Sequence, residues 1–372
     1  KFCWSGFTMK QREKLAAGLL VLLFPVILLV SMMDAFGPSS TQHHRALYNE
    51  ILPIIYDENE HEHIKRMKAT GDYGECEIRP PVFPDHEITP TFSASYPGSG
   101  AKMTWVLIEA ITGLQTHNDI MFDNTRYAVS TKTHYPNREG TLLKGEENVP
   151  RAIIVLRHPL DAFPSYFNYL YEMENHLENH STRAPIQAWI SWRDAHFEGQ
   201  LQNWQHFVEY WMDKFSPADR VIICFEKIIN DVYGPIEAGR LAEFLGRSDG
   251  VNLHPPELIP CIWHKVVKYK DSNNARRRLE SMEGLAKFDI DPNSFALSDP
   301  SRPNSHRDGP KYIPPYNLQQ LNAVKSMLSS LLDKYREESS LNPVLRKYIH
   351  EAEMREEEMR KKKEEKRNAA VL

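Results

Sequence analysis

The 372-residue sequence has few cysteines and no excess of positive charge. Its four cysteines are too few for the disulfide framework that holds small secreted domains together. Lys and Arg number 45 against 50 Asp and Glu, so the net charge of −5 argues against nucleic acid as the main partner. The hydrophobic fraction of 41% excludes a disordered chain, and the length allows one large domain with appendages or two smaller domains. Composition indicates no oligomeric state.

One long run lacks charge altogether. Residues 15–33 read LAAGLLVLLFPVILLVSMM and are long enough, at about 1.5 Å per residue, to cross a ~30 Å hydrocarbon layer. We expect a transmembrane helix here. The alternatives are a buried core helix and a signal peptide, for which the residues up to Asp34 form a poor cleavage site. Basic residues precede the run, so the positive-inside rule places residues 1–14 in the cytosol and the rest of the chain on the other side of the membrane.

Three segments of different character follow this run. Residues 34–90 mix prolines, histidines and charges, which predicts a stem. Residues 91–345 alternate β-rich runs with helical patterns, which predicts an α/β domain, a three-layer sandwich with a central and mainly parallel sheet. Residues 346–372 are rich in Glu, Lys and Arg at i, i+4 spacing, and we expect a solvated charged helix or tail. The predicted strands are residues 91–96, 127–133, 152–156 and 221–225.

A Gly-rich, P-loop-like turn follows the first predicted strand and precedes a helical pattern. This order points backbone N–H groups and the positive end of the helix dipole at one place, which suits a phosphate or sulfate. Gly98 and Gly100 permit close approach of a ligand, and Lys102 adds a positive charge. The alternative is a turn that only joins the strand to the helix. The candidate anion-binding residues are Gly98, Ser99, Gly100, Ala101, Lys102, Met103, Thr104 and Trp105.

This turn differs from the loop of a nucleotide triphosphatase, which requires G-x-x-x-x-G-K-[ST]. Ala101 separates Gly100 from Lys102, and the strand at 152–156 ends in Arg157 rather than in an Asp that would hold Mg²⁺. We therefore expect an anionic donor whose charge is met by protein cations, without a metal.

Three motifs, in this order along the chain, resemble those of the sulfotransferase family that uses 3′-phosphoadenosine 5′-phosphosulfate (PAPS). The segment from SYPGSG at residues 95–100 to Trp105 is similar to the family's 5′-phosphosulfate loop. Residues 132–136 (KTHYP) resemble its Lys-x-His-x-Pro segment, and residues 152–165 resemble its strand followed by Arg and Ser. The family often places Lys or Arg directly after the proline, where this chain has Gly98, so Lys102 is the candidate for the displaced cation.

The resemblance implies PAPS as cosubstrate and roles for the matching residues. His134 would act as general base. Lys132 would orient the site or stabilise the leaving oxygen, and Lys102 would add positive charge. Arg157 and Ser165 would hold the 3′-phosphate. Trp105 would stack on adenine, with a core tryptophan as the alternative. Residues 307–309 are a weak candidate for a C-terminal part of the phosphate site.

The sequence leaves the acceptor and two other functions open. A hydroxyl of a carbohydrate or of a protein fits the proposed chemistry equally well. The other functions are a metal-dependent nucleotide phosphoryl transferase and a non-catalytic binding protein on a sulfotransferase-like scaffold. For the sulfotransferase we expect a type II protein of the Golgi membrane, with the catalytic domain in the lumen.

The cysteines and one sequon suit that compartment. Cys224 lies within an apolar run and is expected to be a buried thiol, which leaves Cys76 and Cys261 as the plausible disulfide. No Cys and His spacing is typical of a zinc site. Asn179 begins an N-x-[ST] sequon and is a candidate glycosylation site.

Overall fold

The structure is a computed structural model, and it describes residues 58–119, 128–137, 139–140, 149–177, 184–269 and 316–369. The predicted anchor at 15–33, the sequon at Asn179 and residues 307–309 lie outside these ranges. Within the ranges, no helix is both long and apolar enough to cross a membrane. The chain divides into a short unit, residues 1–63, and a large unit, residues 64–372, that holds the sheet.

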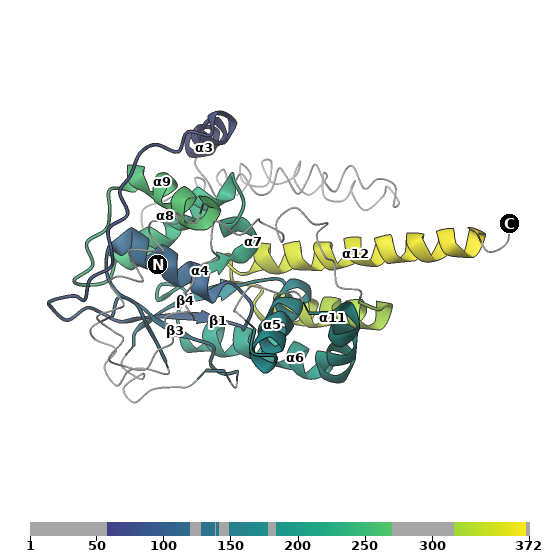
Figure 1. Ribbon diagram of the computed structural model, residues 1–372. Coiled ribbons are helices and arrows are strands. Elements are labelled where there is room, and N and C mark those ends of the chain that lie inside the picture. The colour runs from purple at the N-terminus through teal and green to yellow at the C-terminus, as the bar shows by residue number, and fades with distance from the viewer. Residues whose placement is uncertain are drawn as a thin grey trace, which may run out of the picture. The chain divides into compact units, whose positions relative to one another are not determined.

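Parallel strands form one sheet with the order β2-β3-β1-β4-β5. Figure 1 labels β1, β3 and β4 of this sheet. The strands are β1 (Thr91–Ser95), β2 (His117–Asn118), β3 (Thr131–Thr133), β4 (Arg151–Leu156) and β5 (Arg220–Cys224). Phe92 of β1 is in register with Thr131 of β3 on one side and with Ala152 of β4 on the other. The predicted α/β class and parallel sheet are therefore confirmed. β2 was not predicted, because two residues carry no periodic pattern.

Helices cover both faces of the sheet. Along β4, Ala152, Ile154 and Leu156 face one hydrophobic cluster, whereas Ile153 and Val155 face the other. This alternation follows from the two-residue side-chain period of a strand. The first cluster includes residues of α5 (Pro159–Glu174), α6 (Ile186–Lys214), α11 (Leu318–Lys334) and α12 (Asn342–Ala369). The second includes residues of α4 (Ala101–Thr112), α7 (Phe225–Ile228), α8 (Tyr233–Gly246), η4 (Pro256–Leu258), α9 (Ile259–Trp263) and η5 (His264–Tyr269).

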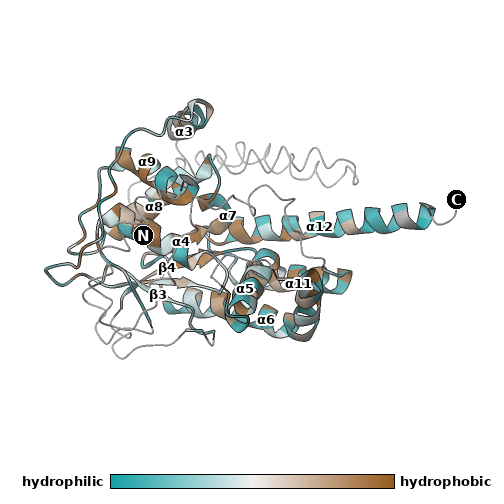
Figure 2. Cartoon of the chain, in the orientation of Figure 1, coloured by the Kyte–Doolittle hydropathy of each residue, from teal (hydrophilic) through white to brown (hydrophobic). Residues whose placement is uncertain are grey.

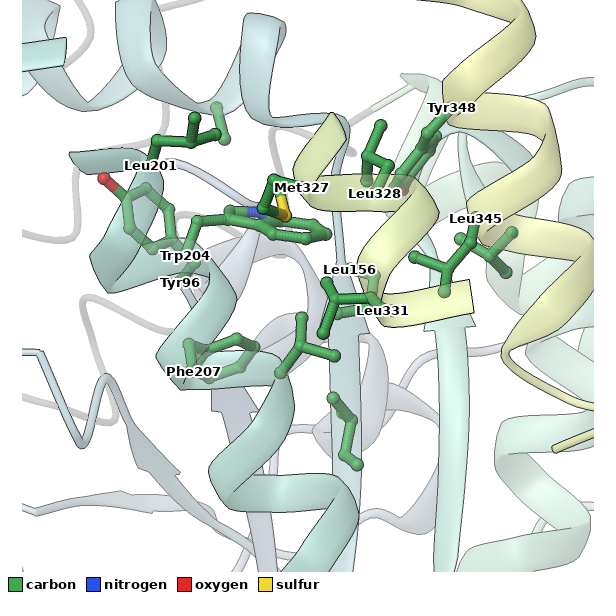
Figure 3. Packing of buried hydrophobic residues seen from close by; sticks show 14 of the residues in the cluster. Tyr96, Leu156, Leu201, Trp204, Phe207, Met327, Leu328, Leu331, Leu345 and Tyr348 are labelled. Carbon is green, nitrogen blue, oxygen red and sulfur yellow. The ribbon is translucent and has the colours of Figure 1, made fainter. Parts of the chain in front are cut away.

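The C-terminal helix α12 is part of the domain core. Leu345 and Tyr348 are fully buried and pack with Trp204 of α6 and Leu328 of α11 (Figure 3). The predicted boundary between residues 345 and 346 therefore lies inside α12, and the solvated helix begins later than expected. Beyond Glu356 the residues are mostly exposed and hydrophilic (Figure 2). The reason is that the first turns of α12 carry an apolar face, which the charge-rich composition of the segment conceals.

Part of the predicted stem also belongs to the core. Helix α3 (Glu58–Thr70) is followed by an extended segment in which Tyr73, Ile78 and Ile88 are buried in the second cluster. The backbone of Val82 donates to Gly113 O and accepts from Gln115 N, at 3.0 and 2.9 Å. Single side chains of the predicted stem are therefore buried in the domain, because prolines in this segment end regular structure without preventing burial.

The disulfide links this N-terminal segment to α9. Cys76 and Cys261 are bonded, and Cys224 is a buried free thiol, as the sequence predicts. The bond joins residues 185 positions apart, so it restricts the unfolded chain strongly.

We expect Cys76→Ser to lower the free energy of unfolding by about 2–5 kcal/mol, because the unfolded chain regains the entropy of the long loop. Thermal denaturation with and without a reducing agent measures this loss. The reductant should lower the Tm of the wild type toward that of the variant and leave the variant unchanged. Equal Tm values for the two proteins without reductant would contradict the expectation.

Candidate functional site

The chain leaves β1, β3, β4 and β5 at the same edge of the sheet. The strands are parallel, so their carboxyl ends meet there, which is where ligands bind in open α/β folds. β1 continues into the Gly-rich loop, β3 into His134, β4 into Arg157 and β5 into Phe225. The fold thus brings the three sequence motifs to one edge.

The Gly-rich loop packs directly against two neighbouring connections. Gly98 and Gly100 have positive φ values of 83° and 90°. A Cβ on Gly98 would lie 2.5 Å from Ala162 O in α5, and a Cβ on Gly100 would lie 2.5 Å from the ring of Phe225. Only glycine fits both places, because other residues are strained there and would also clash.

The loop ends in the first turn of α4, which suits an anion. The first N–H groups of a helix have no partner within the helix and carry the positive end of its dipole. Ser99 Oγ is buried and has no hydrogen-bond partner in the part of the chain that the structure describes. Thr104 Oγ1 donates to Gly100 O at 3.2 Å and so helps to form this first turn.

Arg157 and Ser165 lie beside the loop, and their contact with a 3′-phosphate stays a prediction. The Arg157 guanidinium donates to Gly98 O at 2.7 Å and stacks on Phe225, with 4.4 Å from Cζ to the ring centroid. Ser165 follows on α5, where its Cβ would lie 3.3 Å from a Cβ on Gly98. Burial lowers the pKa of Arg157, while two nearby carboxylates oppose this shift. Arginine remains charged in proteins, so a buried cation lies next to the loop.

His134 is held in one tautomer. Its Nδ1 lies 2.7 Å from Ser95 O, a carbonyl that can only accept, so Nδ1 is the donor. In the neutral ring Nε2 then carries the lone pair. Burial lowers the pKa of His134 to about 3, and the positive charge of Lys132 acts in the same direction. The imidazole is therefore neutral at physiological pH and able to take a proton through Nε2.

Asp119 supports the turn that carries Lys132 and His134. Thr133 Oγ1 donates to Asp119 Oδ2 at 2.6 Å and accepts from Tyr135 N at 2.9 Å. Asp119 N donates to Lys132 O at 3.0 Å. Burial lowers the pKa of Lys132, and the charge of Asp119 opposes that shift. The sequence offered no pattern for Asp119, because it follows the two-residue strand β2.

Two tryptophans of α6 donate hydrogen bonds to the connections that follow β3 and β4. Trp204 Nε1 donates to Arg157 O at 3.2 Å, and Trp211 Nε1 donates to Tyr135 O at 2.8 Å. Both indoles are fully buried. One helix therefore fixes the backbone on the His134 side and on the Arg157 side of the loop.

The remaining predicted residues lie on α4. Ala101, Lys102 and Met103 form its first turn and are half-buried. Trp105 Nε1 donates to Glu109 Oε1 at 2.7 Å, and the same oxygen accepts from Thr116 N at 3.2 Å. These contacts tie Trp105 to the connection between α4 and β2, and its adenine contact stays a prediction.

Phe225 is the aromatic side chain that contacts both the loop and Arg157. Sequence reasoning missed it because it was taken as the last residue of a strand. Its position directly after β5 is the signal that was available.

Within the described ranges, no three His, Cys, Asp or Glu side chains gather closely enough to hold a metal ion.

No family model matches the sequence, and no curated protein matches it. Among solved structures, the crystal structure of mouse sulfotransferase SULT7A1 complexed with PAP resembles this chain. The TM-score is 0.41 and the identity 14%, over 74% of this chain and 90% of that chain. A likeness this remote identifies no activity.

We expect Gly98→Ala to destabilise the protein more than Gly113→Ala does. Both residues have positive φ, which costs a non-glycine residue roughly 1–2 kcal/mol. A Cβ on Gly113 meets nothing within 4 Å, whereas one on Gly98 would clash with α5. Urea denaturation of the two variants measures the difference. Equal losses would show that the loop does not pack closely on α5.

Proposed function

We propose that this protein is a sulfotransferase that moves the sulfuryl group from PAPS to a hydroxyl of a carbohydrate or protein acceptor. The observation that carries the proposal is a neutral His134 at the same sheet edge as a glycine loop backed by a buried Arg157. A base and a cationic anion site are the two components that this transfer needs.

The base acts on the acceptor. His134 Nε2 takes the hydroxyl proton while the acceptor oxygen forms a bond to sulfur. On the side of the sulfur opposite the attacking oxygen, the bond to the 5′-phosphate oxygen breaks, and adenosine 3′,5′-bisphosphate (PAP) leaves with that electron pair. Lys132 and Lys102 provide positive charge for the leaving oxygen, and the imidazolium later returns its proton to solvent.

The donor would be bound by the loop and by Arg157. The 5′-phosphosulfate would lie against the turn formed by Gly98, Ser99, Gly100, Ala101, Lys102, Met103, Thr104 and Trp105. The residues suit an anion, because Ser99 Oγ is unpartnered among the described residues and Arg157 is buried. Arg157 and Ser165 would hold the 3′-phosphate, since a guanidinium can make two parallel hydrogen bonds to phosphate oxygens.

The location in the cell is part of the proposal. We place the protein in the Golgi membrane, anchored by residues 15–33 with the catalytic domain in the lumen. Support comes from the uncharged run and from the Cys76–Cys261 disulfide, because disulfides persist in oxidising compartments.

We expect His134→Asn to retain PAP affinity and to lose about 10²–10⁴-fold in kcat, because the amide keeps a donor for Ser95 O but cannot act as base. The wild type should show no acidic limb of kcat near pH 6.5, since a pKa of about 3 keeps the base deprotonated well below neutrality. A transfer assay across pH with labelled PAPS measures both. Normal transfer by the variant would contradict the base assignment.

We expect PAP to raise the Tm of the protein more than ATP does, with or without Mg²⁺, and Arg157→Gln to weaken PAP binding. The thermal shift and calorimetry measure these effects. A larger shift with ATP and Mg²⁺ would indicate a phosphoryl transferase instead. PAP binding without transfer to any glycan, peptide or lipid hydroxyl would indicate a non-catalytic binding protein.

A further inference from the structure

The proposed donor site has a second layer that comes from the C-terminal helix. Arg157 feels the negative charge of Asp161 in α5 and of Glu226 in α7. Nevertheless, no carboxylate among the described residues forms an ion pair with Arg157. Its guanidinium instead donates a hydrogen bond to Gly98 O. Each of the two carboxylates is occupied by a residue of α12.

Glu226 is bound through Tyr348. The Tyr348 hydroxyl donates to Glu226 Oε2 at 2.8 Å, and His158 N donates to Glu226 Oε1 at 2.8 Å. His158 in turn donates from Nε2 to Tyr348 O at 3.0 Å, while its Nδ1 accepts from Leu160 N at 3.0 Å. Burial lowers the pKa of His158 to about 4, so the ring is neutral in this arrangement. Both oxygens of Glu226 are thereby turned toward α12 and the start of α5.

Asp161 is bound through Arg355. The Arg355 guanidinium donates to Asp161 Oδ2 at 2.7 Å, in a pair whose side chains are 24% and 31% exposed. Although burial opposes it, the charge of Arg355 holds the pKa of Asp161 below its usual value, so the carboxylate is ionised. If Arg355 were removed, the ionised carboxylate of Asp161 would still be attracted by the positive charge of Arg157.

We propose that Tyr348 and Arg355 are positioning residues that keep Arg157 available for a donor phosphate by engaging the two carboxylates that compete for it. The inference rests on the proposed function, because it assumes that Arg157 binds the donor. A carboxylate turned onto Arg157 would both neutralise its charge and occupy its N–H groups, which an incoming phosphate needs. The helix α12, outside every predicted motif, is in this way part of the donor site.

The test is a double-mutant cycle on PAP affinity. Arg355→Gln frees Asp161, and we expect PAP to bind about tenfold more weakly, within the range seen for coupled charged neighbours. In Asp161→Asn/Arg355→Gln the competing charge is gone, and affinity should return to within about twofold of the wild type. Loss of a merely structural contact would not be rescued in this way, because the double variant also lacks the ion pair.

A matched control lies on the same helix. Lys362→Gln removes an equal charge from an exposed i, i+4 pair with Glu358, and PAP affinity should stay unchanged. The KM for PAPS should rise in Arg355→Gln while the KM for the acceptor stays constant. If Arg355→Gln fails to fold, Tyr348→Phe alone and combined with Glu226→Gln provides the same cycle through the other carboxylate.

Arg157→Gln separates the two ways in which the test can fail. If Arg157→Gln leaves PAP affinity unchanged, the donor site itself is misplaced and the proposed function fails. If Arg157→Gln weakens binding but Arg355→Gln does not, or if the double variant shows no rescue, the role of α12 is overturned and the proposed function stands.

Discussion

β1 pairs in parallel with β3 on one side and with β4 on the other, and the placement of the site depends on this pairing. Parallel strands release their chains at one edge, so the glycine loop after β1 lies between the turn at His134 and the turn at Arg157. The hydrogen bonds from His134 to Ser95 O and from Arg157 to Gly98 O join each neighbour to the loop. The central strand thus carries the glycine loop, and its two neighbours carry His134, the proposed base, and Arg157.

The same arrangement explains the hydrogen bonds that α6 makes to the connections after β3 and β4. A connection that leaves a sheet has backbone groups without ladder partners, and buried groups of this kind require a hydrogen bond. Trp204 and Trp211 of α6 supply such donors to the backbone oxygens of Arg157 and Tyr135, while Tyr348 of α12 donates to the Glu226 side chain. Core packing and site geometry are therefore maintained by the same residues.

The side chains beside His134 and the glycine loop include positive charges, although the chain as a whole is negative. The chain has a net charge of −5, yet the positive charge of Lys132 acts on His134, and the Arg157 guanidinium donates to the loop at Gly98 O. Burial makes positive charge costly, and an anionic ligand offsets that cost most effectively in a site that excludes water. Beside Arg157, the carboxylates of Glu226 and Asp161 accept hydrogen bonds from Tyr348 and Arg355 of α12.

Patterns of neighbouring residues were enough to predict the α/β class and four of the strands, and to identify the three motifs. Strand periodicity, the glycine turn and residues such as His134 and Arg157 depend on neighbours a few positions away, which a sequence displays directly. The disulfide partners followed by elimination, because Cys224 lies within an apolar run.

The tertiary structure alone decided which other residues join the site. Asp119, Phe225, Glu226 and Tyr348 carry no motif, and their partners lie far away in the chain, as in the pair of Tyr348 and Glu226, 122 positions apart. The burial of Tyr73, Ile78 and Ile88 and of the apolar face in the first turns of α12 was hidden for the same reason, since proline content and charge describe a segment and not the surface it meets. Sequence periodicity records which face of an element is apolar, whereas the partner of that face is set only when the chain closes around the sheet.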